Sequence, residues 1–140
     1  MANTVRLLLP WGWFLDPNGA ESRKEIVRWW ESRRLAFNVW VGLAGIITWF
    51  TVLIAGSAAV KPGVDFEEPF AMILGPPLYA IIANICYTAG SIIDGIFYKR
   101  APRPRLLQFG FWFSIFLTSL PGLWALYCWV RAVRTGQLLD

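Results

Sequence analysis

Histidine is absent from this sequence of 140 residues, and cysteine occurs only twice. Histidine is the usual general base, the commonest metal ligand and the usual axial ligand of haem. The sequence therefore lacks the usual residue for acid–base catalysis, metal binding and haem ligation. The sequence also has no Cys-x-x-Cys pair, no phosphate-binding glycine loop and no Gly-x-Ser-x-Gly elbow. A pair of carboxylates would need Asp65, Glu67 or Glu68, which are typical of a solvated acidic loop. We therefore expect a non-enzyme with no catalytic residue, metal ligand or cofactor.

Charge is scarce in three long stretches of the chain. Only 16% of the residues are charged, 56% are hydrophobic, and the mean hydropathy is +0.48. Residues 35–60 and 106–130 carry no charge, and residues 69–98 carry only Asp94. Each stretch exceeds the ~20 apolar residues that cross ~30 Å of hydrocarbon. The sequence therefore predicts an all-α integral membrane bundle of three transmembrane helices with an N-terminal amphipathic, interfacial segment.

The expected boundaries follow from the prolines and the charges. Pro76 and Pro77 disfavour a helix that continues from Pro69, because proline lacks the N–H donor and restricts the residue before it. We expect residues 66–75 to lie at the outer interface or to re-enter it. The predicted organisation is a cytoplasmic interfacial arm, a transmembrane domain with its three spans, and a short external tail, at residues 1–34, 35–130 (35–59, 77–98 and 106–130) and 131–140.

The interfacial arm contains a predicted amphipathic helix. Asn18 followed by Glu21 is typical of a helix start, in which the Asn caps the helix and the Glu reaches back. Ile26, Trp29 and Trp30 form the apolar stripe of this helix. The pattern leaves open whether the arm lies on the membrane surface or continues into the first span.

Basic residues are distributed unevenly between the two expected sides of the membrane. Ten Lys and Arg residues fall in the N-terminal segment and the second loop, and three fall in the first loop and the C-terminal tail. The positive-inside rule therefore places the N-terminus in the cytoplasm and the C-terminus outside. The pI of about 9.4 does not indicate nucleic-acid binding, because the charge lies beside membrane segments. The densest basic run is a topology signal or binds anionic lipid headgroups; its residues are Lys99, Arg100, Arg103 and Arg105.

Four polar side chains share one face of the second span. Asn84, Tyr87, Ser91 and Asp94 are separated by three or four residues, and the opposite face is rich in isoleucine. Such a stripe must face protein or water inside a membrane. One interpretation is packing, with hydrogen bonds to the other spans and Asp94 close to Lys99 or Arg100. The other is a path for protons or a solute.

Aromatic residues are abundant, at 16% of the sequence, which is more than two interfacial belts require. On the third span they form a ridge at helical spacing, namely Phe109, Trp112, Phe113 and Phe116. We expect the ridge to face a partner, and the partners to be membrane lipids, other membrane subunits or an apolar ligand. The favoured function is an accessory subunit of a larger membrane complex, and the alternative is a small oligomeric transporter or channel.

Two stretches, WESRRLAFN (30–38) and ANICYTAGSIID (83–94), resemble a loose group of small bacterial multi-pass membrane proteins. Those proteins share a W-E-x-R-R-x-x-aromatic-Asn stretch and an A-N-x-C-Y-x-x-G stretch. The resemblance covers about a sixth of the chain and implies a bacterial inner-membrane protein of no stated activity. It also favours one cluster made of Glu31, Arg33, Arg34, Asn38, Asn84 and Tyr87. However, the depths expected of Asn38 and Asn84 in their spans argue against a direct contact between them.

Overall fold

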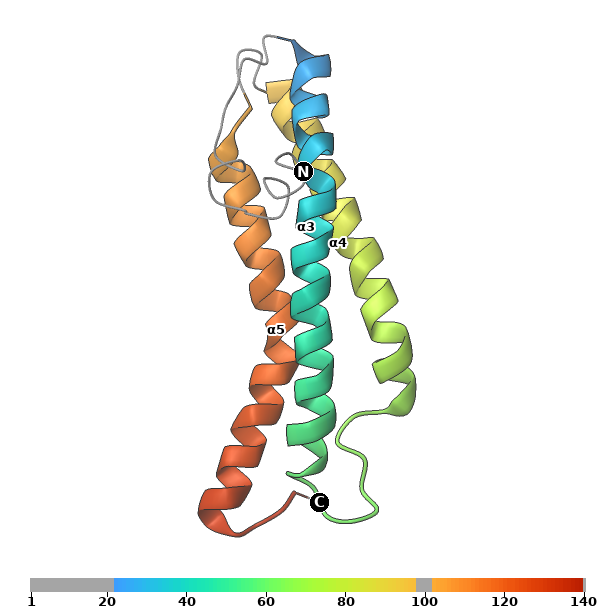
Figure 1. Cartoon of the computed structure of the whole chain (residues 1–140), viewed down its shortest axis with the longest axis vertical. Coiled ribbons are helices and arrows are strands. Elements are labelled where there is room, and N and C mark those ends of the chain that lie inside the picture. Colours follow the sequence, from blue (N-terminus) through green and yellow to red (C-terminus); the bar gives the residue numbers. More distant parts are fainter. Residues whose placement is uncertain (1–21, 98–101, 140) are drawn as a thin grey trace, which may run out of the picture. The chain divides into compact units, whose positions relative to one another are not determined.

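The computed structural model describes residues 22–97 and 102–139, and nearly all of them are helical. The elements are three α-helices and one π-helix (Figure 1), namely α3 (Arg23–Thr51), η1 (Val52–Gly56), α4 (Pro69–Phe97) and α5 (Pro104–Thr135). Three helices, counting η1 with α3, are long and apolar enough to cross a membrane. The predicted all-α class with three spans is therefore confirmed. The 32 residues of α5 extend for about 48 Å at 1.5 Å a residue. The hydrocarbon core of a membrane is ~30 Å thick, so the helix is either tilted in the membrane or projects from it.

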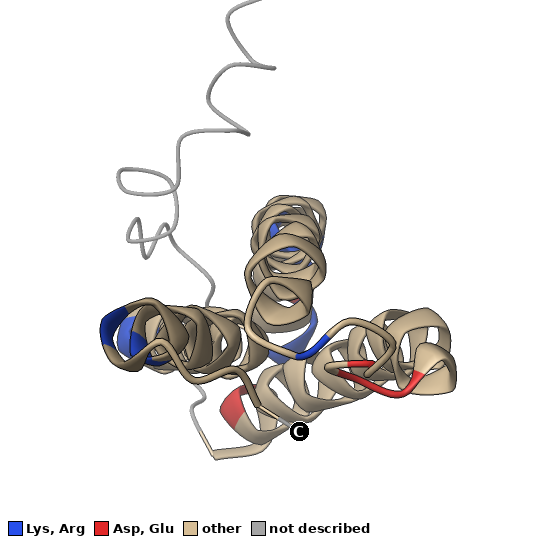
Figure 2. Cartoon of the chain, turned by 90° about the horizontal axis from the view of Figure 1, so that it is seen from below, with Lys and Arg blue, Asp and Glu red and all other residues tan. Residues whose placement is uncertain are grey.

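The charged side chains of the described residues lie in the first part of α3 up to Arg34, around the end of α4 and the start of α5, at the end of α5, and in the loop between η1 and α4. No Asp, Glu, Lys or Arg lies within residues 35–60, 69–93 or 106–130, and most of the ribbon in Figure 2 is tan. The acidic loop residues Asp65 and Glu67 are exposed. This distribution suits helices whose middle parts lie in hydrocarbon, where a charge is costly.

Helix α3 begins with a capping box. The backbone N–H of Glu25 donates to the Ser22 hydroxyl at 3.3 Å, and the Ser22 N–H donates to the Glu25 carboxylate at 3.1 Å. These bonds satisfy two donors at the start of the helix. The predicted cap, Asn18, lies outside the described residues. From Arg23 the helix continues without a break to Thr51, so the amphipathic helix of the arm is the first part of the first span.

The chain divides by its contacts into two compact units, and each contains part of all three helices. The first unit comprises residues 1–40 and 81–114. In it the ring of Phe37 lies 4.7 Å from that of Tyr87 and 6.4 Å from that of Phe111, measured between centroids. Aromatic side chains from α3, α4 and α5 therefore form the centre of this unit.

The second unit comprises residues 41–80 and 115–140 and has a core of small side chains. Its buried cluster consists of Val52, Ala55 and Ala125, with Phe66 and Met72 packed against it. Close helix packing explains the small residues. A Cβ atom on Gly122 would lie 3.4 Å from the Cα atom of Thr48, so α3 and α5 approach each other closely, as small residues allow in membranes.

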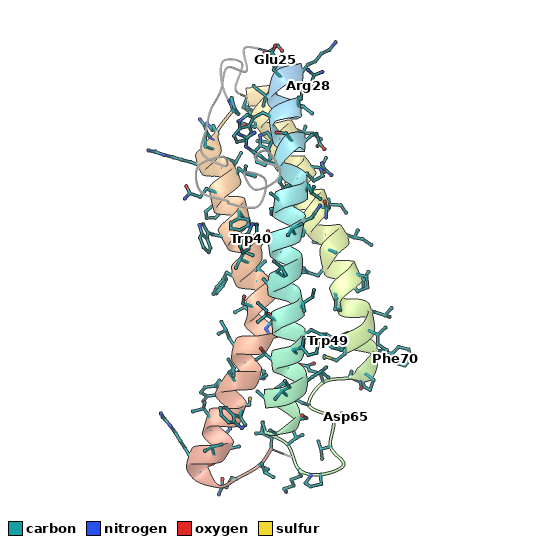
Figure 3. The ribbon with its side chains drawn as sticks, viewed as in Figure 1. Glu25, Arg28, Trp40, Trp49, Asp65 and Phe70 are labelled. Carbon is teal, nitrogen blue, oxygen red and sulfur yellow. The ribbon has the colours of Figure 1, made fainter. Side chains whose placement is uncertain are left out.

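Helix α4 begins at Pro69, so the predicted start at residue 77 is wrong, and Pro76 and Pro77 lie inside the helix. The missing N–H of Pro76 would have bonded to the carbonyl of Met72, four residues earlier. That carbonyl instead accepts the indole N–H of Trp49 at 3.2 Å. A side chain from α3 therefore replaces the lost helical bond, which lets the helix continue across the prolines. Figure 3 shows Phe70, in the first turn of α4, pointing outward.

Helix α5 extends to Thr135, five residues beyond the predicted end of the third span. It ends at Gly136, whose φ of 68° is the left-handed conformation that suits glycine, and whose N–H donates to Ala132 O at 2.9 Å. The backbone of the tail after α5 pairs with the first loop. The Leu139 N–H donates to Ala59 O at 2.9 Å, and the Lys61 N–H donates to Leu139 O at 3.1 Å.

Candidate functional site

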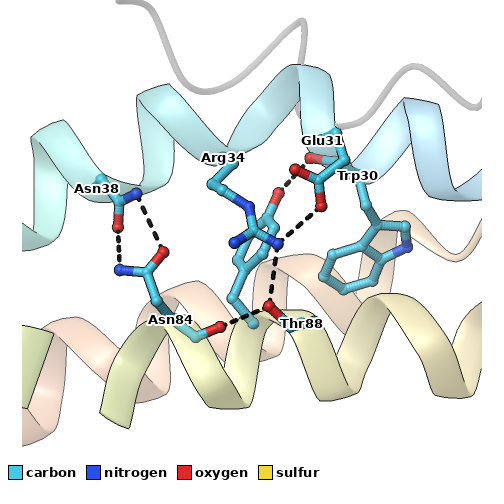
Figure 4. A network of polar contacts seen from close by, with 7 residues as sticks. Trp30, Glu31, Arg34, Asn38, Asn84 and Thr88 are labelled. Atoms are coloured by element: carbon cyan, nitrogen blue, oxygen red, sulfur yellow. Dashed lines mark hydrogen bonds and ion pairs between the residues drawn. The ribbon is translucent and has the colours of Figure 1, made fainter. Parts of the chain in front are cut away.

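The polar face of α4 contacts α3 within the first unit, and its central contact is a pair of amides. The Asn84 side-chain N–H donates to Asn38 Oδ1 at 2.8 Å, and the Asn38 N–H donates to Asn84 Oδ1 at 3.2 Å (Figure 4). Each amide therefore satisfies both a donor and an acceptor of the other. Both residues are partly buried.

This contact corrects the expectation that the two asparagines lie at different depths. That expectation placed Asn38 near the beginning of its span, because the span was thought to start at residue 35. Helix α3 in fact starts at Arg23, so Asn38 lies 15 residues from its beginning, and Asn84 lies 13 residues from the end of α4 at Phe97. In two antiparallel helices these distances place the amides opposite each other.

A charged group lies next to the amide pair. The Arg34 guanidinium donates to the Glu31 carboxylate at 2.7 Å and to the Thr88 hydroxyl at 3.0 Å. Thr88 in turn donates to the backbone oxygen of Asn84 at 2.8 Å (Figure 4). The side chains of Arg34 and Glu31 remain 30% and 47% exposed, so this ion pair lies at the edge of the interface and stabilises it little. Arg34 connects Glu31 on α3 to Thr88 on α4.

Tyr87 occupies the middle of the α3–α4 interface. Its hydroxyl donates to the backbone oxygen of Trp30 at 2.5 Å. Its ring lies between Trp30 and Phe37, at centroid distances of 5.2 and 4.7 Å. The side chain is buried, and the Arg34 guanidinium lies 5.2 Å from the centre of its ring. Tyr87 therefore contributes both aromatic packing and a hydrogen bond to a carbonyl on α3.

Asp94 is fully buried and joins three segments of the first unit. Its Oδ2 atom accepts the indole N–H of Trp30 on α3 and the backbone N–H of Arg103 before α5, both at 2.9 Å. Its Oδ1 atom has no hydrogen-bond partner among the described residues. The expected neighbours Lys99 and Arg100 lie outside the described part of the chain. A carboxylate that accepts two N–H groups holds the start of α5 against α3 and α4.

The structure places the predicted site residues in three separate groups. Asn84, Tyr87 and Asp94 form hydrogen bonds to α3, and Ser91 is buried at 2% exposure. Arg103 and Arg105 are both exposed at the start of α5. The four aromatic side chains of the ridge are 46–70% exposed, at Phe109, Trp112, Phe113 and Phe116.

Trp30 is the residue that the sequence pattern underestimated. It was expected only in an apolar stripe, yet it bonds Asp94 through its side chain and Tyr87 through its carbonyl. Its ring also lies on Gly90, where an added Cβ would be 3.3 Å away. The signal in the sequence is the seven-residue spacing from Trp30 to Phe37, which places both rings on the same face of α3.

Buried Arg33 is a further unexpected contact on α3. Its guanidinium lies 3.8 Å above the Trp29 ring and donates to the Trp29 carbonyl at 3.0 Å. The side chain is 5% exposed.

Within residues 22–97 and 102–139, no three His, Cys, Asp or Glu side chains gather as a metal site would require.

Fold and helix composition together define a multi-pass membrane protein. No protein-family model matches the chain, and no curated protein or solved structure shows significant similarity to it.

Proposed function

We propose that this protein is a non-catalytic accessory subunit that packs, through α5, inside a larger membrane complex of a bacterial inner membrane. The observation that carries the proposal is the outward position of the aromatic ridge. Phe109 and Phe113 stack on each other at 6.0 Å, and both are at least half exposed, as is Phe116. Half or more of each of these three side chains is exposed, which leaves a surface for a partner.

The polar groups support the same function, because they bond within the chain. Asn84, Tyr87 and Asp94 all form hydrogen bonds to α3. A group that is already paired with a neighbouring helix suits packing better than a path for a solute. The exposed side chains of α5 between Leu106 and Val130 are aromatic or apolar.

Aromatic rings attract a partner helix in a membrane by shape and dispersion, because lipid supplies no hydrophobic force between helices. The charge count supports an orientation with the N-terminus in the cytoplasm and the C-terminus outside. In this orientation the ridge starts at the cytoplasmic end of α5 and continues into the membrane.

The test is co-purification from native membranes in a mild detergent. Replacing Trp112 and Phe116 with Leu keeps the helix lipid-soluble but removes the rings, so we expect the variant to remain in the membrane and to lose its partner proteins. The matched control replaces two exposed rings on other helices, Phe50 and Phe70, with Leu and should retain the partners. A wild-type protein that runs as a free monomer with no partner would contradict the proposal.

A further inference from the structure

A pocket opens where α5 begins, at the end of the first unit that also contains Asp94. Its volume is about 740 Å³, within the ~300–1,000 Å³ typical of small-molecule sites. The described residues that line it belong to one short segment, namely Pro102, Arg103, Pro104, Arg105, Leu106 and Phe109. The lining thus combines two cations with apolar side chains.

The cationic part of the pocket is held in place by the fold. The bond from the Arg103 N–H to buried Asp94 fixes the segment that precedes α5. Arg105 lies in the first turn of α5, where the helix dipole adds positive potential. Both arginine side chains are exposed, and no ion pair among the described residues involves Arg105. The lining therefore includes two exposed arginines, and guanidinium groups suit phosphate by shape and charge.

The apolar part of the pocket leads along α5 into the membrane segment. Phe109 is 70% exposed and stacks on Phe113, one turn further along the helix. From Leu106 to Val130 the helix has no charged residue. A ligand that fits both parts has an anionic head and a long apolar tail. Neither free phosphate nor nucleic acid supplies such a tail.

We propose that this pocket binds an anionic phospholipid, with the headgroup phosphate on Arg103 and Arg105 and an acyl chain along Leu106 and Phe109. The site shares Phe109 with the ridge of the proposed function, but its headgroup contacts, Arg103 and Arg105, lie outside the ridge. The arginine variants therefore test lipid binding without altering Trp112 or Phe116. The site goes beyond a topology signal, for which any basic residues on the correct side would serve. A topology signal requires no pocket and does not distinguish one lipid headgroup from another.

The experiment uses the full-length protein, delipidated in mild detergent and titrated with phosphatidylglycerol, with bound lipid counted by native mass spectrometry. A basic side chain near an anionic lipid surface contributes about fivefold in affinity. We therefore expect Arg103→Gln/Arg105→Gln to bind phosphatidylglycerol about 30-fold more weakly. The control Arg131→Gln/Arg134→Gln removes two exposed arginines from the other end of α5 and should bind like wild type.

Three further binding measurements identify the class of ligand. Phosphatidylcholine should bind the wild type at least tenfold more weakly, and inorganic phosphate should not displace phosphatidylglycerol. Phe109→Ala should weaken binding severalfold, whereas Phe70→Ala, which alters an equally exposed ring on α4, should not. Equal binding of both lipids, displacement by phosphate, or equal losses in the two arginine pairs overturns the proposal. Circular dichroism of each variant verifies folding. Arg103→Lys/Arg105→Lys keeps the charge but loses the guanidinium shape, so it should bind more weakly than wild type and more tightly than Arg103→Gln/Arg105→Gln.

Discussion

The indole N–H of Trp30 lies 2.9 Å from Oδ2 of Asp94, although 64 residues separate the two in the sequence. The bond joins α3 to α4 near the end of the first unit, and the same carboxylate oxygen also accepts the Arg103 N–H. A buried carboxylate needs such donors, because an unpaired charge away from water is costly. This contact therefore fixes where α4 ends and α5 begins relative to α3 within the unit.

Replacing Trp30 with Phe keeps a ring at this position but removes the donor to Asp94. A hydrogen bond to a charged group contributes about 1.5–3 kcal/mol, so we expect the free energy of unfolding to fall by about 2 kcal/mol in detergent. Trp124→Phe, at a 58% exposed site, is the matched control and should change it by less than about 0.5 kcal/mol. Equal destabilisation by the two variants would argue against a special function of the Trp30 bond.

The Asn38–Asn84 pair predicts non-additive effects. Asn84→Leu leaves the amide of Asn38 without its partner, and we expect a loss of about 1 kcal/mol in detergent stability, since interhelical bonds in membranes average ~0.6 and reach ~1.7 kcal/mol. Replacing both asparagines with Leu should cost less than the sum of the single changes. A double-variant cycle by thermal unfolding measures this coupling.

The same variant separates packing from transport. Purified wild-type protein in liposomes should conduct neither protons nor solute if the amides serve packing. If it does conduct, and Asn84→Leu or Asp94→Asn stops the current, the transporter alternative replaces the accessory function.

The sequence predicted three membrane-spanning helices but not where each helix starts or ends. Uncharged runs of this length have few other solutions in a membrane. The sequence also identified the face of α4 that meets α3, because the polar residues follow the helical period. It did not predict which residues meet. The pairing of Asn38 with Asn84 was not expected, because the first span was predicted to start at residue 35, whereas α3 starts at Arg23.

The start of α4 could not be predicted from local sequence. The rule that proline ends a helix is local, whereas the donor that replaces the lost N–H is the side chain of Trp49, 23 residues before Met72. The buried position of Asp94 likewise depends on an indole from α3 and a backbone N–H from the segment before α5. Contacts of this kind need the tertiary structure, because no periodicity in one helix encodes them.

Gly56 should tolerate no side chain, since an added Cβ would lie 2.5 Å from the ring of Phe66. We expect Gly56→Ala to displace this ring from the cluster around Val52 and to lower the free energy of unfolding by about 1–3 kcal/mol. Gly42→Ala is the matched control, because nothing lies within 4 Å of its Cβ position, and alanine there should be neutral or stabilising. Phe66→Leu should relieve part of the clash, and its failure to do so would point to another cause.

The charge asymmetry predicts the sidedness of the membrane protein. A phosphatase reporter that is active only outside the cytoplasm should be active when fused after Asp140 and inactive when inserted within residues 100–105. A cytoplasmic fluorescent reporter at the same positions should give the reverse pattern. Equal activity at the two positions would contradict an odd number of spans between them.

The bond from Trp49 to the Met72 carbonyl predicts that the effect of one residue depends on a proline in another helix. Trp49→Phe removes the donor and should cost about 0.5–1.5 kcal/mol, because the carbonyl freed by Pro76 then has no N–H. Pro76→Ala restores the helical donor of residue 76, so in that background the carbonyl is satisfied without the indole. We therefore expect Trp49→Phe to cost almost nothing when combined with Pro76→Ala. Thermal unfolding of the wild type, both single variants and the double variant measures this coupling. Additive effects would mean that Trp49 does not replace the bond lost at Pro76, and that α4 crosses its prolines for a different reason.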